Sequence, residues 1–194
     1  YGVERYYSAM QSRMQALYES STHDALTGLH NRRGAMDTVQ KLLTRRAKSY
    51  AALLIDIDGL KLINDMRGHA TGDAIIAIIA EAIRESIREG DECARIGGDE
   101  FFVFAADCTT DEAMAMGQRI LDKLARPSLP LSGAHASVSI GVVVLDGADA
   151  EFNRMYRDAD QALYQASYEG KSRIGLFVPD VTDTMESPAP AFTA

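Results

Sequence analysis

Cysteine is scarce in this sequence and long hydrophobic runs are absent, and each shortage excludes a class of protein. Only two cysteines occur in 194 residues, Cys93 and Cys108, and they form neither a CxxC pair nor a cluster with histidine. A disulfide scaffold and a zinc site are therefore not indicated. No apolar run approaches the roughly 20 residues that a helix needs to cross a bilayer, and no segment resembles a signal peptide. We expect a cytoplasmic protein, either free or as the cytoplasmic part of a membrane-bound sensor.

Positive charge is also in short supply. Lysine and arginine number 20 against 28 aspartates and glutamates, which gives a net charge of −8. This balance disfavours nucleic acid as a partner, because binding to phosphate backbones depends on clustered cations. The 46% hydrophobic and 25% charged content is typical of a globular domain with one sizeable core. The chain begins with tyrosine rather than methionine, so we expect it to be part of a longer protein.

Residues 1–20 are expected to form a separate signalling helix. Its apolar residues follow a heptad spacing of four, three, four and three: Val3, Tyr7, Met10, Met14 and Leu17. The spacing predicts a coiled coil, or alternatively an amphipathic helix packed on its own domain. Turn-forming and charged residues follow at 23–33 and make that segment a candidate hinge.

Strands and helices are expected to alternate along the rest of the chain. Strands are expected at 50–57, 93–96, 101–104, 136–145 and 173–178, and helices at 32–47, 61–66, 71–87, 111–125 and 151–169. The glycine pair at 97–98 stands between two strand-like runs and predicts a hairpin. This order is typical of an α+β fold with antiparallel pairing. Residues 179–194 have little to bury and are expected to be a disordered tail.

Two pairs of acids stand at the ends of the expected strands. Asp56 and Asp58 end the most apolar strand, and Asp99 and Glu100 follow the hairpin turn. Bringing these carboxylates together is unfavourable unless a cation lies between them. Carboxylates combined with phosphate oxygens form a typical Mg²⁺ site. Each pair taken alone also fits a solvated loop.

Four blocks of sequence, in order, resemble the diguanylate cyclase (GGDEF) family. Residues 95–101, RIGGDEF, contain the signature, and 24–33, DALTGLHNRR, resemble the family's DxLTGLxNRR start. Residues 56–73 resemble its DxDxFKxINDxxGHxxGD block, and 158–166 resemble its closing DxALYxAK helix. The resemblance implies a nucleotidyl-cyclase, palm-like fold with a central antiparallel sheet flanked by helices, in a domain of residues 21–178.

The resemblance also implies an activity. Family members join two GTP molecules into cyclic di-GMP, release two pyrophosphates and work as homodimers in which each subunit holds one GTP. The metal, Mg²⁺ or Mn²⁺, would lie on the carboxylates of Asp56 and Asp99 and on the backbone carbonyl of Ile57. The catalytic residues would be Asp99 and Glu100, with Glu100 as base or orienter for the attacking 3′-hydroxyl. Which of the two acids takes the proton is left open.

Substrate-binding residues carry over in the same way. Asn64 and Asp73 fall on the guanine-binding positions, and an amide with a carboxylate suits guanine's edge. Gly98 would let the turn approach the nucleotide without a Cβ. The groups expected on the terminal phosphates are the backbone amides of Gly59, Leu60 and Lys61 and the ammonium of Lys171.

A product-binding site is implied as well. Arg88 and Asp91 match the family's inhibitory RxxD motif, which stands five residues before the GGDEF signature and binds cyclic di-GMP. Arg119 on the following helix is expected to be an additional ligand. The alternative interpretation of Arg88 and Asp91 is a surface salt bridge at a helix end.

One block departs from the family pattern. Ser167 stands where the family has a phosphate-binding lysine, and Lys171 stands where it has an arginine. The loss of one charge-assisted hydrogen bond costs roughly 1.5–3 kcal/mol, so we expect weak turnover or a high requirement for GTP. The alternative is a catalytically weak or inactive domain that binds GTP or cyclic di-GMP as a regulatory module. A third reading, an adenine-containing product, is disfavoured by Asp73. An upstream sensor domain is expected to act through residues 1–20.

Overall fold

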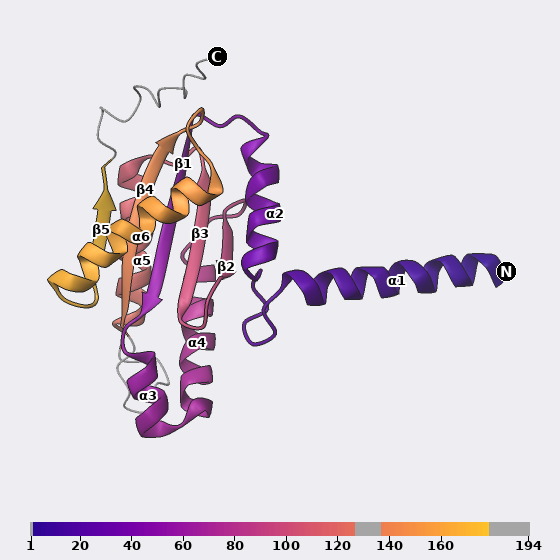
Figure 1. The fold of residues 1–194 in the computed structure, drawn as a ribbon, viewed down its shortest axis with the longest axis horizontal. Coiled ribbons are helices and arrows are strands. Elements are labelled where there is room, and N and C mark those ends of the chain that lie inside the picture. The colour runs from indigo at the N-terminus through magenta and orange to yellow at the C-terminus, as the bar shows by residue number, and fades with distance from the viewer. Residues whose placement is uncertain (1, 127–136, 179–194) are drawn as a thin grey trace, which may run out of the picture.

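The computed structural model describes residues 2–126 and 137–178 and shows a five-stranded sheet between two layers of helices (Figure 1). The strands are β1 (Ser49–Ile57), β2 (Glu92–Arg95), β3 (Glu100–Ala106), β4 (Val138–Asp146) and β5 (Ile174–Phe177). The helices are α1 (Gly2–Thr22), α2 (Arg32–Leu43), α3 (Leu60–Arg67), α4 (His69–Arg84), α5 (Thr110–Leu124) and α6 (Phe152–Glu169). The expected tail at 179–194 lies outside the described residues.

The sheet has the order β2-β3-β1-β4-β5, with the most apolar strand, β1, at its centre. The pairs β2/β3, β3/β1 and β1/β4 are antiparallel, as expected, and β2 and β3 form the hairpin around the glycine pair. The central strands are thus antiparallel, and only the edge strand β5 differs among the described strands, because it runs parallel to β4. Helix α6 connects these two strands and brings the chain back to the end where β4 began, as parallel pairing requires. The fold remains an α+β, palm-like one with a mixed sheet.

Side-chain alternation along β1 divides the core between the two faces of the sheet. Tyr50, Ala52 and Leu54 pack towards α2 and α6. The alternate residues, among them Leu53 and Ile55, pack towards α4 and α5. Because successive side chains of a strand point to opposite faces, Asp56 falls on the face covered by α2 and α6. The alternation of side chains therefore determines which residues surround the Asp56 carboxylate.

Helix α2 is shorter than its apolar pattern predicts. Asn31 caps its beginning by accepting a hydrogen bond of 3.0 Å from the backbone N–H of Gly34. The helix ends at Leu43 rather than at residue 47, and Arg46 adopts a left-handed conformation with φ of 51°. The backbone then turns directly into β1, so the expected last helical turn becomes part of the connection.

Helix α1 projects away from the sheet and its helices (Figure 1). Its heptad side chains are exposed by about half or more: Tyr7 62%, Met10 49%, Met14 62% and Leu17 61%. The alternative of an apolar face buried on its own domain is therefore not what the structure shows for these four residues. Within the described residues, no helix has the length and apolar content needed to span a membrane.

The turn between α1 and α2 is tied to the hairpin. The carboxylate of Asp24 accepts hydrogen bonds from the guanidinium of Arg95, at 3.2 and 3.3 Å. The same guanidinium donates to the carbonyl of Gly98 at 2.7 Å. The candidate hinge is thus an ordered turn, connected through one arginine to the glycine turn before the second pair of acids.

Candidate active site

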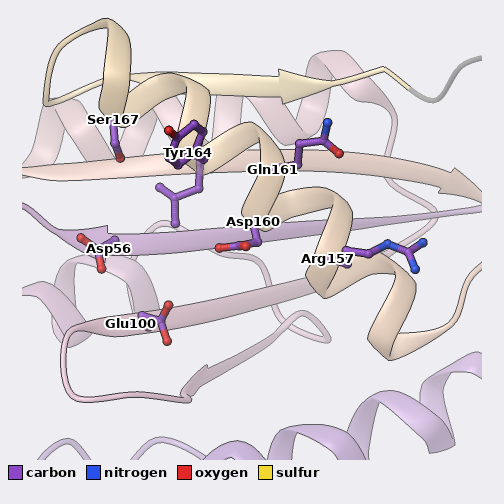
Figure 2. A pocket seen from close by; sticks show the side chains of 8 residues that line it. Asp56, Glu100, Arg157, Asp160, Gln161, Tyr164 and Ser167 are labelled. Atoms are coloured by element: carbon purple, nitrogen blue, oxygen red, sulfur yellow. The ribbon is translucent and has the colours of Figure 1, made fainter.

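Two of the predicted acids face each other at one end of the sheet. Asp56 in β1 is the cross-strand partner of Glu100 in β3, and both side chains lie on the α6 side. Figure 2 shows them next to each other beneath α6, from which Asp160 extends towards them. A cavity of about 460 Å³ lies here, and its lining consists of Asp56, Glu100, Arg157, Asp160, Gln161, Leu163, Tyr164 and Ser167. The structure therefore brings one acid of each predicted pair into a single cavity.

The electrostatics of this cavity favour a cation. Burial raises the pKa of Asp56 to about 7, with further contributions from the negative charges of Asp99 and Glu100. Lys171 opposes this rise in the pKa of Asp56. Burial also raises the pKa of Glu100, assisted by Asp99 and Asp160. Half-buried carboxylates that repel one another gain stability from a positive ligand.

The predicted metal ligands converge at the end of β1. The backbone N–H of Ile57 donates to the carbonyl of Asp99 at 3.0 Å, which holds the hairpin turn against β1. In the described part of the chain, no three histidine, cysteine, aspartate or glutamate side chains are grouped to hold a metal. Mg²⁺ is commonly bound by one or two carboxylates together with phosphate oxygens and water. Asp56, Asp99 and the Ile57 carbonyl therefore fit a metal that arrives with a nucleotide.

Asp58, the second acid at this end of β1, is held by hydrogen bonds from other parts of the chain. Its carboxylate accepts hydrogen bonds from the hydroxyls of Ser137 at 2.6 Å and Ser139 at 2.8 Å. It also accepts a hydrogen bond of 3.1 Å from the backbone N–H of Ser172. Asp58 is therefore anchored to the beginning of β4 and to the loop after α6, while its negative charge still contributes to the raised pKa of Asp56.

The predicted phosphate-binding residues form a turn at the start of α3. Gly59 has φ of +72°, which favours glycine, and it precedes the helix without any side-chain cap within the described residues. The first backbone N–H groups of α3, those of Leu60 and Lys61, are thus available to an anion. The ammonium of Lys171 lies 3.7 Å from the position that a Cβ on Gly59 would occupy. Four predicted phosphate ligands therefore meet at one turn.

The predicted guanine-binding residues lie where α3 packs on α4. The side-chain oxygen Oδ1 of Asn64 is buried and has no hydrogen-bond partner among the described residues. A Cβ on Gly72 would lie 1.9 Å from this oxygen, so the absence of a side chain at Gly72 makes room for Asn64. Asp73 follows Gly72 directly and is exposed. A buried acceptor without a donor is a costly feature, and the Asn64 amide would have to turn away from Gly72 for a ligand N–H group to reach this oxygen.

Helix α6 contributes residues that the sequence analysis did not assign to the site. Arg157, Asp160, Gln161 and Tyr164 line the cavity and lie along one helix face. The signal available in the sequence was their spacing of three, one and three residues, which places them on one helix face, in and just before the block that resembles the closing family motif. Ser167 lies one turn further along this face and also lines the cavity. The residue that departs from the family pattern is thus directly at the candidate site.

Gly98 is exposed in the hairpin turn. Within the described residues, nothing lies within 4 Å of the position that a Cβ on Gly98 would occupy. Open space is therefore available beside Asp99 for a ligand.

The predicted inhibitory residues lie at the other end of β2. Arg88 and Asp91 form an ion pair with 3.1 Å between Nε and Oδ1. Arg88 also donates to the backbone carbonyls of Ala106 and Asp107. Arg119 donates twice to the carbonyl of Ser86, at 2.9 and 3.2 Å. Three side chains that could bind a nucleotide thus lie around the segment between α4 and β2. Each already forms a hydrogen bond or an ion pair within the protein.

The sequence of this chain is similar to those of known diguanylate cyclases. The sequence matches the diguanylate cyclase GGDEF domain over residues 21–173. It is 35% identical over 175 residues to the probable diguanylate cyclase DgcT of Escherichia coli, a match that covers 85% of this chain and 37% of that protein. The chain therefore spans little more than a third of that relative's length.

Solved structures agree on the fold. The GGDEF domain of TpbB (YfiN) from Pseudomonas aeruginosa aligns with a TM-score of 0.70 and 32% identity, covering 80% of this chain and 94% of that one. The coiled coil and GGDEF domain of DgcB from Caulobacter crescentus, solved in complex with c-di-GMP, aligns with a TM-score of 0.82 over 90% of this chain and 95% of that one. At 22% identity, this second likeness concerns the fold alone.

Proposed function

Because the chain belongs to the GGDEF family of diguanylate cyclases, we propose that it condenses two GTP molecules into cyclic di-GMP with release of two pyrophosphates. The observation that carries the proposal is the cross-strand acid pair, Asp56 and Glu100, in one cavity beside the phosphate turn. The placement of Asn64 beside Gly72 and Asp73, an amide next to an exposed carboxylate, supports guanine as the base. The substrate GTP would place this activity in the cytoplasm.

The metal site of this proposal consists of the carboxylates of Asp56 and Asp99 and the carbonyl of Ile57. A bound Mg²⁺ or Mn²⁺ would neutralise charge on the α-phosphate and on the leaving pyrophosphate. Burial, and after it the nearby charges of Asp99 and Glu100, raise the pKa of Asp56, so the ionised carboxylate is unfavourable here without a further cation. A metal ion bound to phosphate would supply positive charge beside Asp56 in addition to that of Lys171.

The protein's own groups bind and orient the substrate. Asn64 and Asp73 would contact the guanine edge, while the start of α3 and Lys171 would hold the terminal phosphates. Glu100, whose pKa is raised by burial and by Asp99, would orient the attacking 3′-hydroxyl or take its proton. A raised pKa brings a carboxylate closer to the range in which a general base is effective at neutral pH.

A homodimer is part of the proposal. One subunit holds one GTP, so two subunits must face each other for the 3′-hydroxyl of one nucleotide to reach the α-phosphate of the other. The exposed heptad side chains of α1 offer a surface for pairing two copies. Such pairing raises the effective concentration of one half-site near the other, and an upstream sensor domain would regulate it.

Product inhibition through Arg88, Asp91 and Arg119 is a further part of the proposal. Arg88 would have to exchange its ion pair with Asp91 for contacts to the guanine or phosphate of cyclic di-GMP. Guanidinium groups suit this exchange because they form parallel hydrogen bonds to phosphates and to guanine.

A second candidate function is favoured by one observation. Ser167 lines the cavity at the position where the family has lysine, so the triphosphate has one cation fewer. A domain weakened in this way would bind GTP or cyclic di-GMP and regulate a partner without turnover.

Product analysis with GTP and Mg²⁺ distinguishes the two functions. We expect cyclic di-GMP from the purified protein and from an Arg88→Ala variant, which removes inhibition by carried-over product. The double variant Asp99→Ala, Glu100→Ala should yield none. No product from the first two proteins, together with retained GTP binding, would favour the regulatory module. Competition between ATP and GTP tests the base preference.

A further inference from the structure

Asp58 links three segments that are distant in the sequence. Its carboxylate lies between the serines at the beginning of β4 and the loop after α6, with hydrogen bonds from Ser137, Ser139 and the backbone of Ser172. Its own backbone N–H donates to the carbonyl of Ser137 at 2.9 Å. The side chain of Asp58 thus joins the loop after α6 to the end of β1.

The loop that Asp58 holds carries Lys171. Ser172 adopts φ of 62°, a left-handed conformation that is unfavourable for a residue with a side chain. The hydrogen bond from the Ser172 N–H to Asp58 contributes to holding this conformation. The preceding residue places its ammonium 3.7 Å from the Cβ position of Gly59, over the phosphate turn. The contact to Asp58 is therefore one residue away from a proposed phosphate ligand.

We propose that Asp58 is a positioning residue, which acts by holding Lys171 over the triphosphate and is not itself a metal ligand. The inference rests on the proposed function. The departure at Ser167 would make this role more important: with the usual lysine missing, the position of Lys171 determines more of the phosphate affinity. An ionised carboxylate suits this role because it accepts all three hydrogen bonds without offering a competing donor.

A double-mutant cycle on nucleotide affinity tests the proposal. The probe is guanosine 5′-[α,β-methylene]triphosphate, whose α–β linkage is not cleaved, with GMP as the control that lacks terminal phosphates. We expect Asp58→Ala and Lys171→Met each to weaken binding of the triphosphate by about tenfold, the size of one charge-assisted hydrogen bond. The double variant should bind no more than about twofold more weakly than either single one, since both act through the same ammonium. GMP affinity should stay unchanged.

Two further measurements separate positioning from other roles. Hydrogen exchange at the Ser172 amide should be slow in the wild type and fast in Asp58→Ala, whatever the activity. The Mg²⁺ concentration needed for half-maximal binding should change in Asp56→Asn but not in Asp58→Ala. If Asp58→Ala does not fold, Asp58→Glu, which keeps the charge and moves the carboxylate by one methylene, replaces it.

The outcomes are distinct. Additive losses in the cycle, a protected Ser172 amide in Asp58→Ala, or a shifted Mg²⁺ requirement in that variant would each overturn the positioning role while leaving the proposed function intact. A wild-type protein that binds neither the triphosphate analogue nor GTP would instead contradict the proposed function, and the inference with it.

Discussion

Asp56 and Glu100 lie directly opposite each other on neighbouring antiparallel strands, with both side chains on the face covered by α6. Like charges in such cross-strand positions destabilise a sheet. This acid pair therefore lowers the stability of the metal-free protein. The stability should change with pH and with the binding of metal and nucleotide.

The first prediction concerns pH and the stability of the metal-free protein. The pKa of Asp56 is raised from 3.8 to about 7, so the folded state binds this proton more tightly than the unfolded state. The stabilising effect of the protonated form is present below about pH 4 and is lost as pH rises through 7. Asp56→Asn should therefore stabilise the protein at pH 8, by about 1–2 kcal/mol after allowing for solvent screening at a half-buried site.

Denaturant unfolding in the presence of a chelator measures this effect at pH 8 and pH 4.5. The difference between Asp56→Asn and wild type should shrink towards zero at the lower pH. Asp122→Asn, an exposed carboxylate on α5, serves as the control and should show no such trend. A difference of equal size at both pH values would contradict the assignment to Asp56.

The second prediction concerns the missing cation at Ser167. Ser167→Lys adds a charge to the lining of the cavity and should lower the GTP requirement, or raise turnover, by about tenfold or more. Steady-state kinetics with GTP and Mg²⁺ measure it. The matched control is Tyr168→Lys, which adds the same charge at a position that is 83% exposed. An equal gain from both variants would indicate a general charge effect.

The third prediction concerns the packing of Gly72 against Asn64. Gly72→Ala places a methyl group 1.9 Å from Oδ1 of Asn64 in the present geometry, so the amide must move. We expect the KM for GTP to rise at least fivefold with little loss of kcat, because guanine contacts persist from ground state to transition state. In an Asn64→Ala background the same substitution should change nothing further. Additive effects would show that Gly72 acts by another route.

The fourth prediction concerns product inhibition. Arg88→Ala removes a guanidinium from the end of α4 and should raise the cyclic di-GMP concentration for half-maximal inhibition by at least tenfold. Initial-rate measurements with added product test it. Arg84→Ala, an exposed arginine one turn earlier that pairs with Glu81, is the control. Unchanged inhibition in Arg88→Ala would instead favour the interpretation of Arg88 and Asp91 as a surface salt bridge.

The fifth prediction concerns the exposed stripe of α1. The double variant Met10→Lys, Met14→Lys places two charges in the proposed dimer seam and should lower activity at limiting protein concentration. Analytical ultracentrifugation should show less dimer. Gln11→Lys with Gln15→Lys puts equal charges on neighbouring exposed positions and should have little effect. Activity that stays independent of protein concentration in every variant would exclude α1 as the dimer surface.

Local patterns in the sequence were sufficient for much of this structure. A continuous apolar run predicts β1, the glycine pair predicts the hairpin, and 3.6-residue periodicity predicts the long helices, because each pattern reflects contacts within one element. The order of the motif blocks predicts the family, which the comparisons confirm. Helix ends were less predictable: α2 stops at Leu43 because the backbone must turn into β1.

Contacts between distant segments could not be predicted in this way. The parallel pairing of β5 with β4 depends on where α6 returns the chain. The sequence suggested that Asp56 and Asp58 act as a pair, and the structure adds that Asp58 accepts hydrogen bonds from three serines, 79 to 114 positions away. Nothing adjacent to Asp58 in the chain indicates those partners.

The amino-acid sequence by itself determined the elements, the family and the identity of the acids, since these depend on residue type and short-range spacing. Only the tertiary structure decided which acids share a cavity, which one holds a loop, and that Asp160 and Ser167 of α6 stand over the site. The physical reason is that strand order and side-chain parity fix which groups meet across the sheet, and both are properties of the folded chain as a whole.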